Sequence, residues 1–203
     1  MTTGILALQG DYAEHRAALG RHSVPTRLVR RVADLEGLTA LVLPGGESTT
    51  MLRLLDDEGL FEPLGELLRS GIPVLGTCAG LILLAERVEN PRQRSYGVLP
   101  VTIVRNGYGR QLHSGTFPLA GASRDLPERM TGTFIRAPRI TAVERGCEIL
   151  ARRGNDPVLV RKGAVLGACF HPELDPGHPV LSLFARISRG EPELGARSAL
   201  PAS

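Results

Sequence analysis

The sequence predicts an α/β protein with a mostly parallel sheet, antiparallel additions, and helices on both faces. The first half alternates short, wholly apolar runs with helix-favouring segments, a pattern typical of buried parallel strands. After about residue 90 the strand-like runs follow one another with few helical segments between them, which indicates antiparallel strands. At 203 residues, of which 42% are hydrophobic, the chain is long enough for one domain with a substantial core.

The first half predicts four strands and the helices that connect them. Each apolar run stops at glycine or proline or passes into a segment that favours a helix. Strands are expected at residues 4–9, 25–30, 40–43 and 71–77, and helices at 12–19, 33–37, 49–57, 61–70 and 81–85.

The second half predicts seven short strands and a last helix. The strands are expected at residues 98–104, 111–117, 131–135, 140–143, 147–151, 158–161 and 164–170. The helix is expected at 179–188, with a proline at its start. Because no long linker divides the chain, we expect a single domain over residues 1–189 and a loosely held tail over 190–203.

Composition argues against several classes of function. No apolar run approaches the roughly 20 residues needed to span a bilayer, and the first ten residues lack the basic region of a signal peptide. The net charge is +3 and the arginines are scattered, so we expect neither a membrane nor a nucleic-acid partner. Three cysteines without metal-type spacing indicate reduced thiols in the cytoplasm and no metal site.

Residues 71–85 contain the feature around which the rest is arranged. A strand, the corner Gly76-Thr-Cys78-Ala-Gly80 and a helix-favouring run have the form of a nucleophile elbow with cysteine in place of serine. Backbone N–H groups at the start of a helix favour a thiolate there. A merely buried cysteine beside a strand–helix turn is the alternative, since free cysteine is commonly buried.

His171-Pro-Glu173 could supply the base that such a cysteine needs. In an extended chain, residues two apart point to the same side, so Glu173 could orient the imidazole of His171. A surface histidine near an acid is the alternative. His15, His22, His113 and His178 lie in polar surroundings, and we expect them at the surface; Cys147 and Cys169 are expected to be small core residues.

The loop Pro44-Gly-Gly-Glu-Ser-Thr-Thr50 lies between a predicted strand and a predicted helix. Its glycines expose backbone N–H groups that suit an oxyanion or a carboxylate, and Ser48 or Thr49 could cap the helix. It lacks the spacing of a phosphate-binding P-loop. An ordinary glycine turn with a helix cap is the alternative.

Together these segments resemble the class I (triad) glutamine amidotransferases, and most closely the glutaminase subunits of pyridoxal 5′-phosphate synthase. The resemblance covers nearly the whole chain. It rests on Leu6-Ala-Leu-Gln-Gly10 with Glu14-His15, residues 43–51, residues 76–85, Arg105-Asn-x-Tyr-Gly-Arg-Gln111, Phe134-Ile-Arg-Ala-Pro138 and Phe170-His-Pro-Glu-Leu174. Two departures from the family pattern, Gly107 and the run from His113 to Thr116, leave the three triad residues unchanged.

The resemblance implies a Rossmann-like, flavodoxin-type fold and hydrolysis of L-glutamine to glutamate and ammonia. Cys78 would form a γ-glutamyl thioester, His171 would transfer protons, and Glu173 would hold His171. Backbone N–H groups of Gly46 and Ala79 would bind the oxyanion. The glutamine would contact Gly46, Glu47, Ser48, Arg105, Ile135 and Arg136.

The resemblance also implies a partner and no cofactor. A synthase subunit would receive the ammonia, in a complex with twelve copies of each chain, and the glutaminase would be poorly active alone. Three alternatives stay open: a glutaminase serving another amidotransferase, such as the one in imidazole glycerol phosphate synthesis, a cysteine hydrolase or peptidase, and a catalytically silent docking protein.

Overall fold

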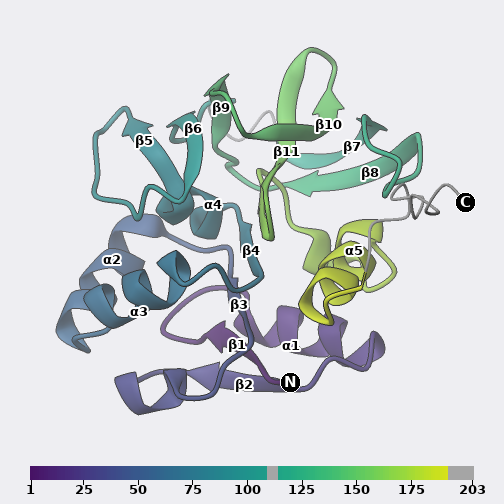
Figure 1. Cartoon of the computed structure of the whole chain (residues 1–203). Coiled ribbons are helices and arrows are strands. Elements are labelled where there is room, and N and C mark those ends of the chain that lie inside the picture. Colours follow the sequence, from purple (N-terminus) through teal and green to yellow (C-terminus); the bar gives the residue numbers. More distant parts are fainter. Residues whose placement is uncertain (109–113, 192–203) are drawn as a thin grey trace, which may run out of the picture.

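A computed structural model describes residues 1–108 and 114–191. Its centre is a nine-stranded sheet, which is parallel in its first five strands and antiparallel in the rest (Figure 1). The parallel strands lie in the order β2 (Thr26–Val29), β1 (Thr3–Leu6), β3 (Ala40–Leu43), β4 (Val74–Thr77) and β12 (Val165–Ala168). The antiparallel strands follow in the order β11 (Asp156–Lys162), β10 (Glu148–Arg153), β7 (Gly115–Gly121) and β8 (Arg129–Phe134).

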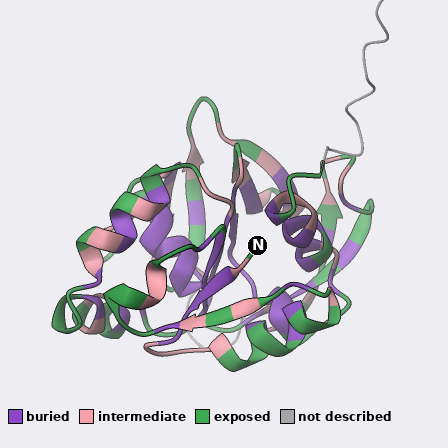
Figure 2. Cartoon of the chain, turned by 60° about the horizontal axis from the view of Figure 1, so that its bottom comes forward, coloured by how far each residue is buried: buried purple, intermediate pink, exposed green. Residues whose placement is uncertain are grey.

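Helices cover both faces of the parallel part, as the sequence predicts. On one side lie α1 (Tyr12–Arg21) and α5 (Pro179–Ser188), and on the other lie α2 (Ser48–Asp57) and α3 (Phe61–Arg69) (Figure 1). The short 3-10 helix η1 (Val32–Leu35) follows β2 and packs near α3. Strands β1, β3, β4 and β12 are buried along their whole length, and Figure 2 shows the buried sheet between helices whose outer faces are exposed.

A second sheet contains three strands, β5 (Ala85–Glu89), β6 (Leu99–Val104) and β9 (Arg139–Val143). The strands predicted at 98–104 and 140–143 are confirmed as β6 and β9, whereas β5 and the separate sheet are not predicted. The expected helix over 81–85 is wrong at its end, because α4 (Ala79–Leu84) stops at Leu84 and Ala85 begins β5. The extended backbone of Ala85, with ψ of 149°, starts the strand directly after the helix.

The strand order of the parallel part, 2-1-3-4-12, is that of a flavodoxin-type sheet. In such sheets ligands bind beyond the carboxyl ends of the strands, where the strand order reverses. Here the reversal lies between β1 and β3, and β4 and β12 end at the same edge. The fold therefore gathers the segments that follow these four strands at one place.

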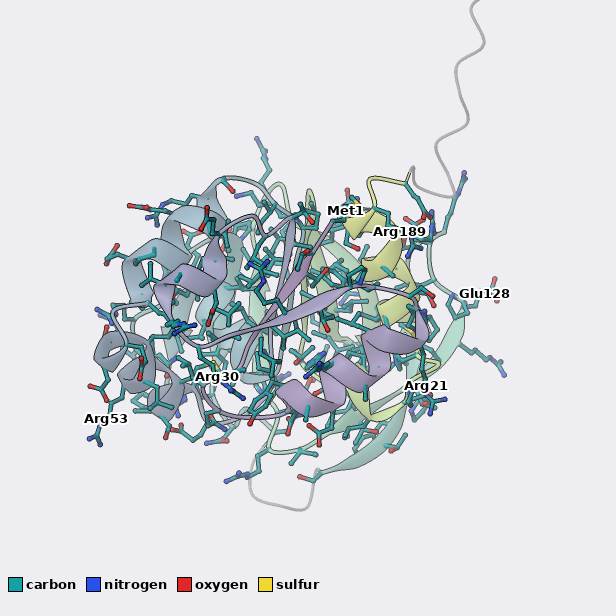
Figure 3. The ribbon with its side chains drawn as sticks, turned by 90° about the horizontal axis from the view of Figure 1, so that it is seen from below. Met1, Arg21, Arg30, Arg53, Glu128 and Arg189 are labelled. Carbon is teal, nitrogen blue, oxygen red and sulfur yellow. The ribbon has the colours of Figure 1, made fainter. Side chains whose placement is uncertain are left out.

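The remaining predicted elements are mostly confirmed, and α5 has the predicted bounds. The strand expected at 111–117 begins later, as β7 at Gly115, and residues 111–113 lie outside the described part. Most of the expected tail, residues 192–203, also lies outside it. No described helix is long and apolar enough to cross a membrane. Figure 3 shows charged side chains at the periphery, with Arg53 and Glu128 at opposite edges.

Candidate active site

Cys78 stands at the sharp turn between β4 and α4. Its backbone has φ 47° and ψ −102°, a left-handed φ that is rare for a residue with a side chain, and it is 7% exposed. Gly80 makes the turn possible, because a Cβ there would lie 1.9 Å from the carbonyl oxygen of Leu43. Gly76 has a similar role, since a Cβ there would lie 2.5 Å from Leu84. The predicted strand, sharp turn and helix around Cys78 are confirmed.

His171 and Glu173 follow β12, the strand beside β4. Nδ1 of His171 lies 2.8 Å from Oε1 of Glu173, and both side chains are buried. The expected extended chain is wrong, because Pro172–Leu174 form the 3-10 helix η3. The turn still brings the two side chains together, with the carboxylate on Nδ1 of the ring.

Asp11, in the loop after β1, is a second carboxylate at the same ring. Its Oδ2 lies 3.2 Å from Nδ1 of His171. The close approach requires a glycine at position 45, where a Cβ would lie 2.4 Å from the ring of His171 and 2.8 Å from the Asp11 carboxylate. The ring of His171 thus packs against two carboxylates and against the backbone of Gly45, which has no side chain.

These neighbours favour the imidazolium form of His171. Burial opposes a charge on the ring, but the side chains of Asp11, Cys78 and Glu173 outweigh it and raise the pKa of His171 far above its ordinary 6.5. The same contact with His171 lowers the pKa of Asp11 below 3.8. An imidazolium beside a cysteine is the arrangement that stabilises a thiolate.

Asp11, His171 and Glu173 also offer atoms within 4.8 Å of one another, the one such group of potential metal ligands in the described part. The 2.8 Å contact between ring and carboxylate is a hydrogen bond. In a metal site, each of these atoms would instead lie about 2 Å from an ion placed between them. The group therefore fits a histidine oriented by carboxylates.

The loop after β3 faces the cysteine and is held by the loop after β1. Gly46 has φ 148°, and a Cβ there would lie 2.5 Å from the amide of Gln9. The same amide oxygen accepts a hydrogen bond from the backbone N–H of Glu47, at 2.9 Å. Gln9 therefore clamps the loop in which the oxyanion donor Gly46 is expected. Ala79, the other expected donor, is the first residue of α4 and is buried.

Glu47 caps α2, so the expected cap at Ser48 or Thr49 is wrong. Its carboxylate accepts hydrogen bonds from the backbone N–H groups of Thr49 and Thr50. Partial burial opposes the charge of Glu47, but these N–H groups and the Thr50 hydroxyl outweigh it and lower its pKa to about 2. Nη2 of Arg105 lies 2.9 Å from Oε1 of the same carboxylate.

A cavity of about 390 Å³ joins these groups, within the usual size range of small-ligand sites. Of the residues predicted as site residues it is lined by Gly46, Glu47, Ser48, Cys78, Arg105, Ile135, Arg136 and His171. Glu173 lies behind His171. Ser48, which the resemblance implies to contact the glutamine, donates its hydroxyl to the side chain of Gln93 at 3.0 Å.

Four further residues line the cavity and were not predicted: Gln9, Asp11, Ile82 and Asn106. Gln9 is the last residue of the first predicted strand and Asp11 lies two residues further on, so the rule that ligands bind at the carboxyl ends of parallel strands could have indicated both. Ile135 is 44% exposed at the cavity, and Arg136 has a left-handed φ of 45°. The backbone conformation at residues 135–136, more than any side-chain pattern in the sequence, therefore determines how this segment meets the cavity.

Two histidines expected at the surface are buried, and that expectation is wrong for both. His15 is fully buried beside Glu173, and His178 is 3% exposed and caps α5. His22 is half-buried, and His113 lies outside the described residues. Cys169 is fully buried, as predicted, and burial raises the pKa of its thiol, while Cys147 is half-buried.

The chemistry of this arrangement is that of acyl transfer. A cysteine at a strand–helix turn faces a histidine that is oriented by a carboxylate, and glycine-rich backbone lies opposite. On a flavodoxin-type sheet, this combination defines the triad class of glutamine amidotransferases.

Comparisons with known proteins agree with that class and narrow it. Residues 5–188 match the SNO glutamine amidotransferase family, and the chain belongs to this family. It is 48% identical over 175 residues to pyridoxal 5′-phosphate synthase subunit PdxT of Thermotoga neapolitana, covering 86% of this chain and 92% of that protein. It is 46% identical over 190 residues to subunit PdxT of Koribacter versatilis, covering 93% of this chain and 96% of that protein. A crystal structure of a glutamine amidotransferase superposes with a TM-score of 0.84 at 40% identity, covering 92% of this chain and 98% of that one.

Proposed function

We propose that this chain is the glutaminase subunit of a pyridoxal 5′-phosphate synthase. It hydrolyses L-glutamine to L-glutamate and ammonia and passes the ammonia to a synthase subunit. The observation that carries the proposal is the hydrogen bond of 2.8 Å between His171 and Glu173, which follow the strand next to that of Cys78, with His171 and Cys78 lining one cavity. The names of the relatives support the pathway.

Each triad residue has one role in the reaction. The Cys78 thiolate attacks the side-chain amide carbon of glutamine. His171, charged by proton transfer from the thiol, gives its proton to the departing ammonia, and a γ-glutamyl thioester remains. The neutral ring then takes a proton from water, which attacks the thioester and releases glutamate. Glu173 holds Nδ1–H, so that Nε2 faces the reacting atoms.

Backbone N–H groups of Gly46 and Ala79 stabilise the oxyanion. Gly46 lies in the loop that Gln9 clamps, and Ala79 follows the nucleophile. Donors fixed before the reaction stabilise the developing charge without a cost of reorganisation. Activity depends on the orientation of the Gly46 peptide, and we infer that a docked synthase raises activity by setting this orientation.

The rim of the cavity recognises the amino-acid end of the substrate. Glu47 binds the α-ammonium group and Arg105 the α-carboxylate, while the backbone around Ser48, Ile135 and Arg136 completes the contacts. The opposite charges of Glu47 and Arg105 suit a free amino acid, which carries both an ammonium and a carboxylate group, better than a residue within a peptide. That favours a glutaminase over a peptidase on the same elbow.

The wider setting follows the family. The chain works as a single domain over residues 1–189 with a loose tail over 190–203, in the cytoplasm, within a complex of twelve glutaminase and twelve synthase chains. It needs no cofactor of its own. Because ammonia loses its nucleophilic lone pair when water protonates it, transfer within the complex is favoured over release.

Glutamate release, measured with and without the synthase subunit, tests the proposal. Wild type is expected to be activated by the synthase, and His171→Asn is expected to lose activity by roughly a thousandfold or more. A rate that ignores the substitution would disprove the triad. A rate stimulated only by the synthase of imidazole glycerol phosphate formation would place the chain in another pathway.

A further inference from the structure

His15 is a fully buried histidine beside the triad that the reaction described above does not use. It lies on α1, and its Nε2 is 3.0 Å from the hydroxyl of Thr77 and 3.3 Å from Oε2 of Glu173. Thr77 directly precedes Cys78 in the chain. The ring therefore lies between the end of the nucleophile's strand and the carboxylate that orients the catalytic base.

The two oxygens of Glu173 have different surroundings. Oε1 lies 2.8 Å from Nδ1 of His171, whereas Oε2 makes no hydrogen bond of good geometry within the described part and lies 3.3 Å from Nε2 of His15. The side chains of His15 and Glu173 are both completely buried. A buried carboxylate oxygen is costly to leave unpaired, because an ionised carboxylate only accepts hydrogen bonds.

The charge state of His15 fits a donor to that oxygen. Burial is the largest effect and lowers the pKa of the ring, His171 lowers it further, and Glu173, Asp11 and Glu14 oppose these effects. The ring is therefore neutral at neutral pH and carries one proton. The carboxylate favours that proton on Nε2, and Nδ1, which has no hydrogen-bond partner in the described part, is then the bare nitrogen.

We propose that His15 is a positioning residue of this site, which holds Oε2 of Glu173 through Nε2–H so that Oε1 stays on His171. The ring acts through Glu173 and touches neither substrate nor cysteine. By fixing the carboxylate it keeps the imidazolium of His171 charged and correctly turned. The contact with Thr77 ties the same ring to the last residue of β4, directly before Cys78.

Alkylation of Cys78 by iodoacetamide tests this role without glutamine or synthase. The rate is measured between about pH 5 and pH 9 on the isolated chain, and peptide mass spectrometry separates Cys78 from Cys147 and Cys169. His15→Leu is expected to slow alkylation of Cys78 at pH 7 about tenfold and to move its pH midpoint upward by about one unit. His15→Gln, whose amide N–H can replace Nε2–H, is expected to restore most of the rate.

A second measurement, of glutaminase activity, rests on the proposed function. With the synthase present, His15→Leu is expected to lower kcat about tenfold or more and to change KM less than about twofold, because it touches no substrate. A wild type without glutaminase activity, together with a shifted alkylation midpoint in His15→Leu, would overturn the proposed function and support the role of His15.

His178→Leu is the matched control, because this ring is also buried but forms its hydrogen bonds with the backbone of Thr131 and Val180 and with no triad side chain. It is expected to lower the Tm and to leave the alkylation midpoint unchanged. A His15→Leu protein that loses only thermal stability, with an unchanged midpoint, would overturn the proposal. If His15→Leu does not fold, His15→Asn, whose amide is too short to reach Glu173, replaces it, and an unchanged midpoint there overturns the proposal equally.

Discussion

The guanidinium of Arg105 and the carboxylate of Glu47 form an ion pair of 2.9 Å at the cavity that contains Cys78. Each group is the complement of one charge of a free amino acid. Glu47 is fixed by the first turn of α2, and Arg105 follows β6, so two different elements set their separation. A bound glutamine would exchange this pair for two pairs with its own ammonium and carboxylate.

Glu47→Gln should weaken glutamine binding. The amide keeps the shape of the side chain but loses the charge that attracts the α-ammonium group, so KM should rise about tenfold with kcat nearly unchanged. Steady-state glutaminase kinetics with the synthase present measure both constants. Glu62→Gln, an exposed position on α3, is the matched control and should behave as wild type. A KM equal to that of wild type in Glu47→Gln would remove Glu47 from substrate binding.

Arg105→Lys should not act as a conservative change. Lysine keeps the charge but loses the planar fork that pairs with a carboxylate in two places, so KM should rise about five- to tenfold. Arg105→Met, which also loses the charge, should raise KM further. Equal kinetics for arginine and lysine at this position would mean that the side chain supplies only a diffuse positive charge.

Gly80→Ala should destabilise the protein strongly. A methyl group would lie 1.9 Å from the backbone oxygen of Leu43, which no rotamer change can relieve, so we expect a loss of about 3 kcal/mol or more. Gly20→Ala is the control, since a Cβ there meets nothing within 4 Å in helix α1, and it should stabilise by about 0.5–1 kcal/mol. Chemical denaturation of both variants gives the comparison, and a Gly80→Ala protein as stable as wild type would contradict the described packing of the elbow.

Asp11→Asn should lower stability in a pH-dependent way. The pKa of Asp11 is lowered in the folded protein, so its contribution is present above its ordinary pKa of 3.8 and is lost as the pH falls through the folded value. The pKa of His171 is raised in the folded protein. The contribution of His171 to the free energy of unfolding is therefore fully present below pH 6.5 and is lost only well above neutral pH. Melting temperatures of wild type and variant should therefore differ most near about pH 6 and converge as the pH falls below the folded pKa of Asp11. A constant difference over that range would show that the carboxylate's charge is not involved.

Much of the fold and the triad could be predicted because the signals are local. The run 71–80 carries its own strand, turn glycines and cysteine, and the helix over 179–188 carries its proline start. Such features depend on neighbours in the sequence. The order of the parallel strands and the meeting of Cys78 with His171 followed from family resemblance and the strand pattern together.

The missed features depend on contacts between distant segments. Strand β5 begins directly after the apolar run of α4, with no turn residue to separate helix from strand, and its partner β6 starts at Leu99. His15 lies on a helix with polar neighbours, and it is buried by contacts with distant segments, among them η3 and Thr77 of β4. Glu47 caps α2 although Ser48 and Thr49 are the more usual cap residues, because its longer side chain folds back on the first turn.

Transfer of isotopic nitrogen tests the central claim most directly. Glutamine labelled with ¹⁵N in its side-chain amide is supplied to the glutaminase–synthase complex together with unlabelled ammonium, and the ring nitrogen of the pyridoxal 5′-phosphate formed is analysed by mass spectrometry. Wild type should place mainly ¹⁵N in the ring, whereas a complex with Cys78→Ala should form product only from the unlabelled ammonium. A labelled ring from the Cys78→Ala complex, or an unlabelled ring from wild type, would contradict the account.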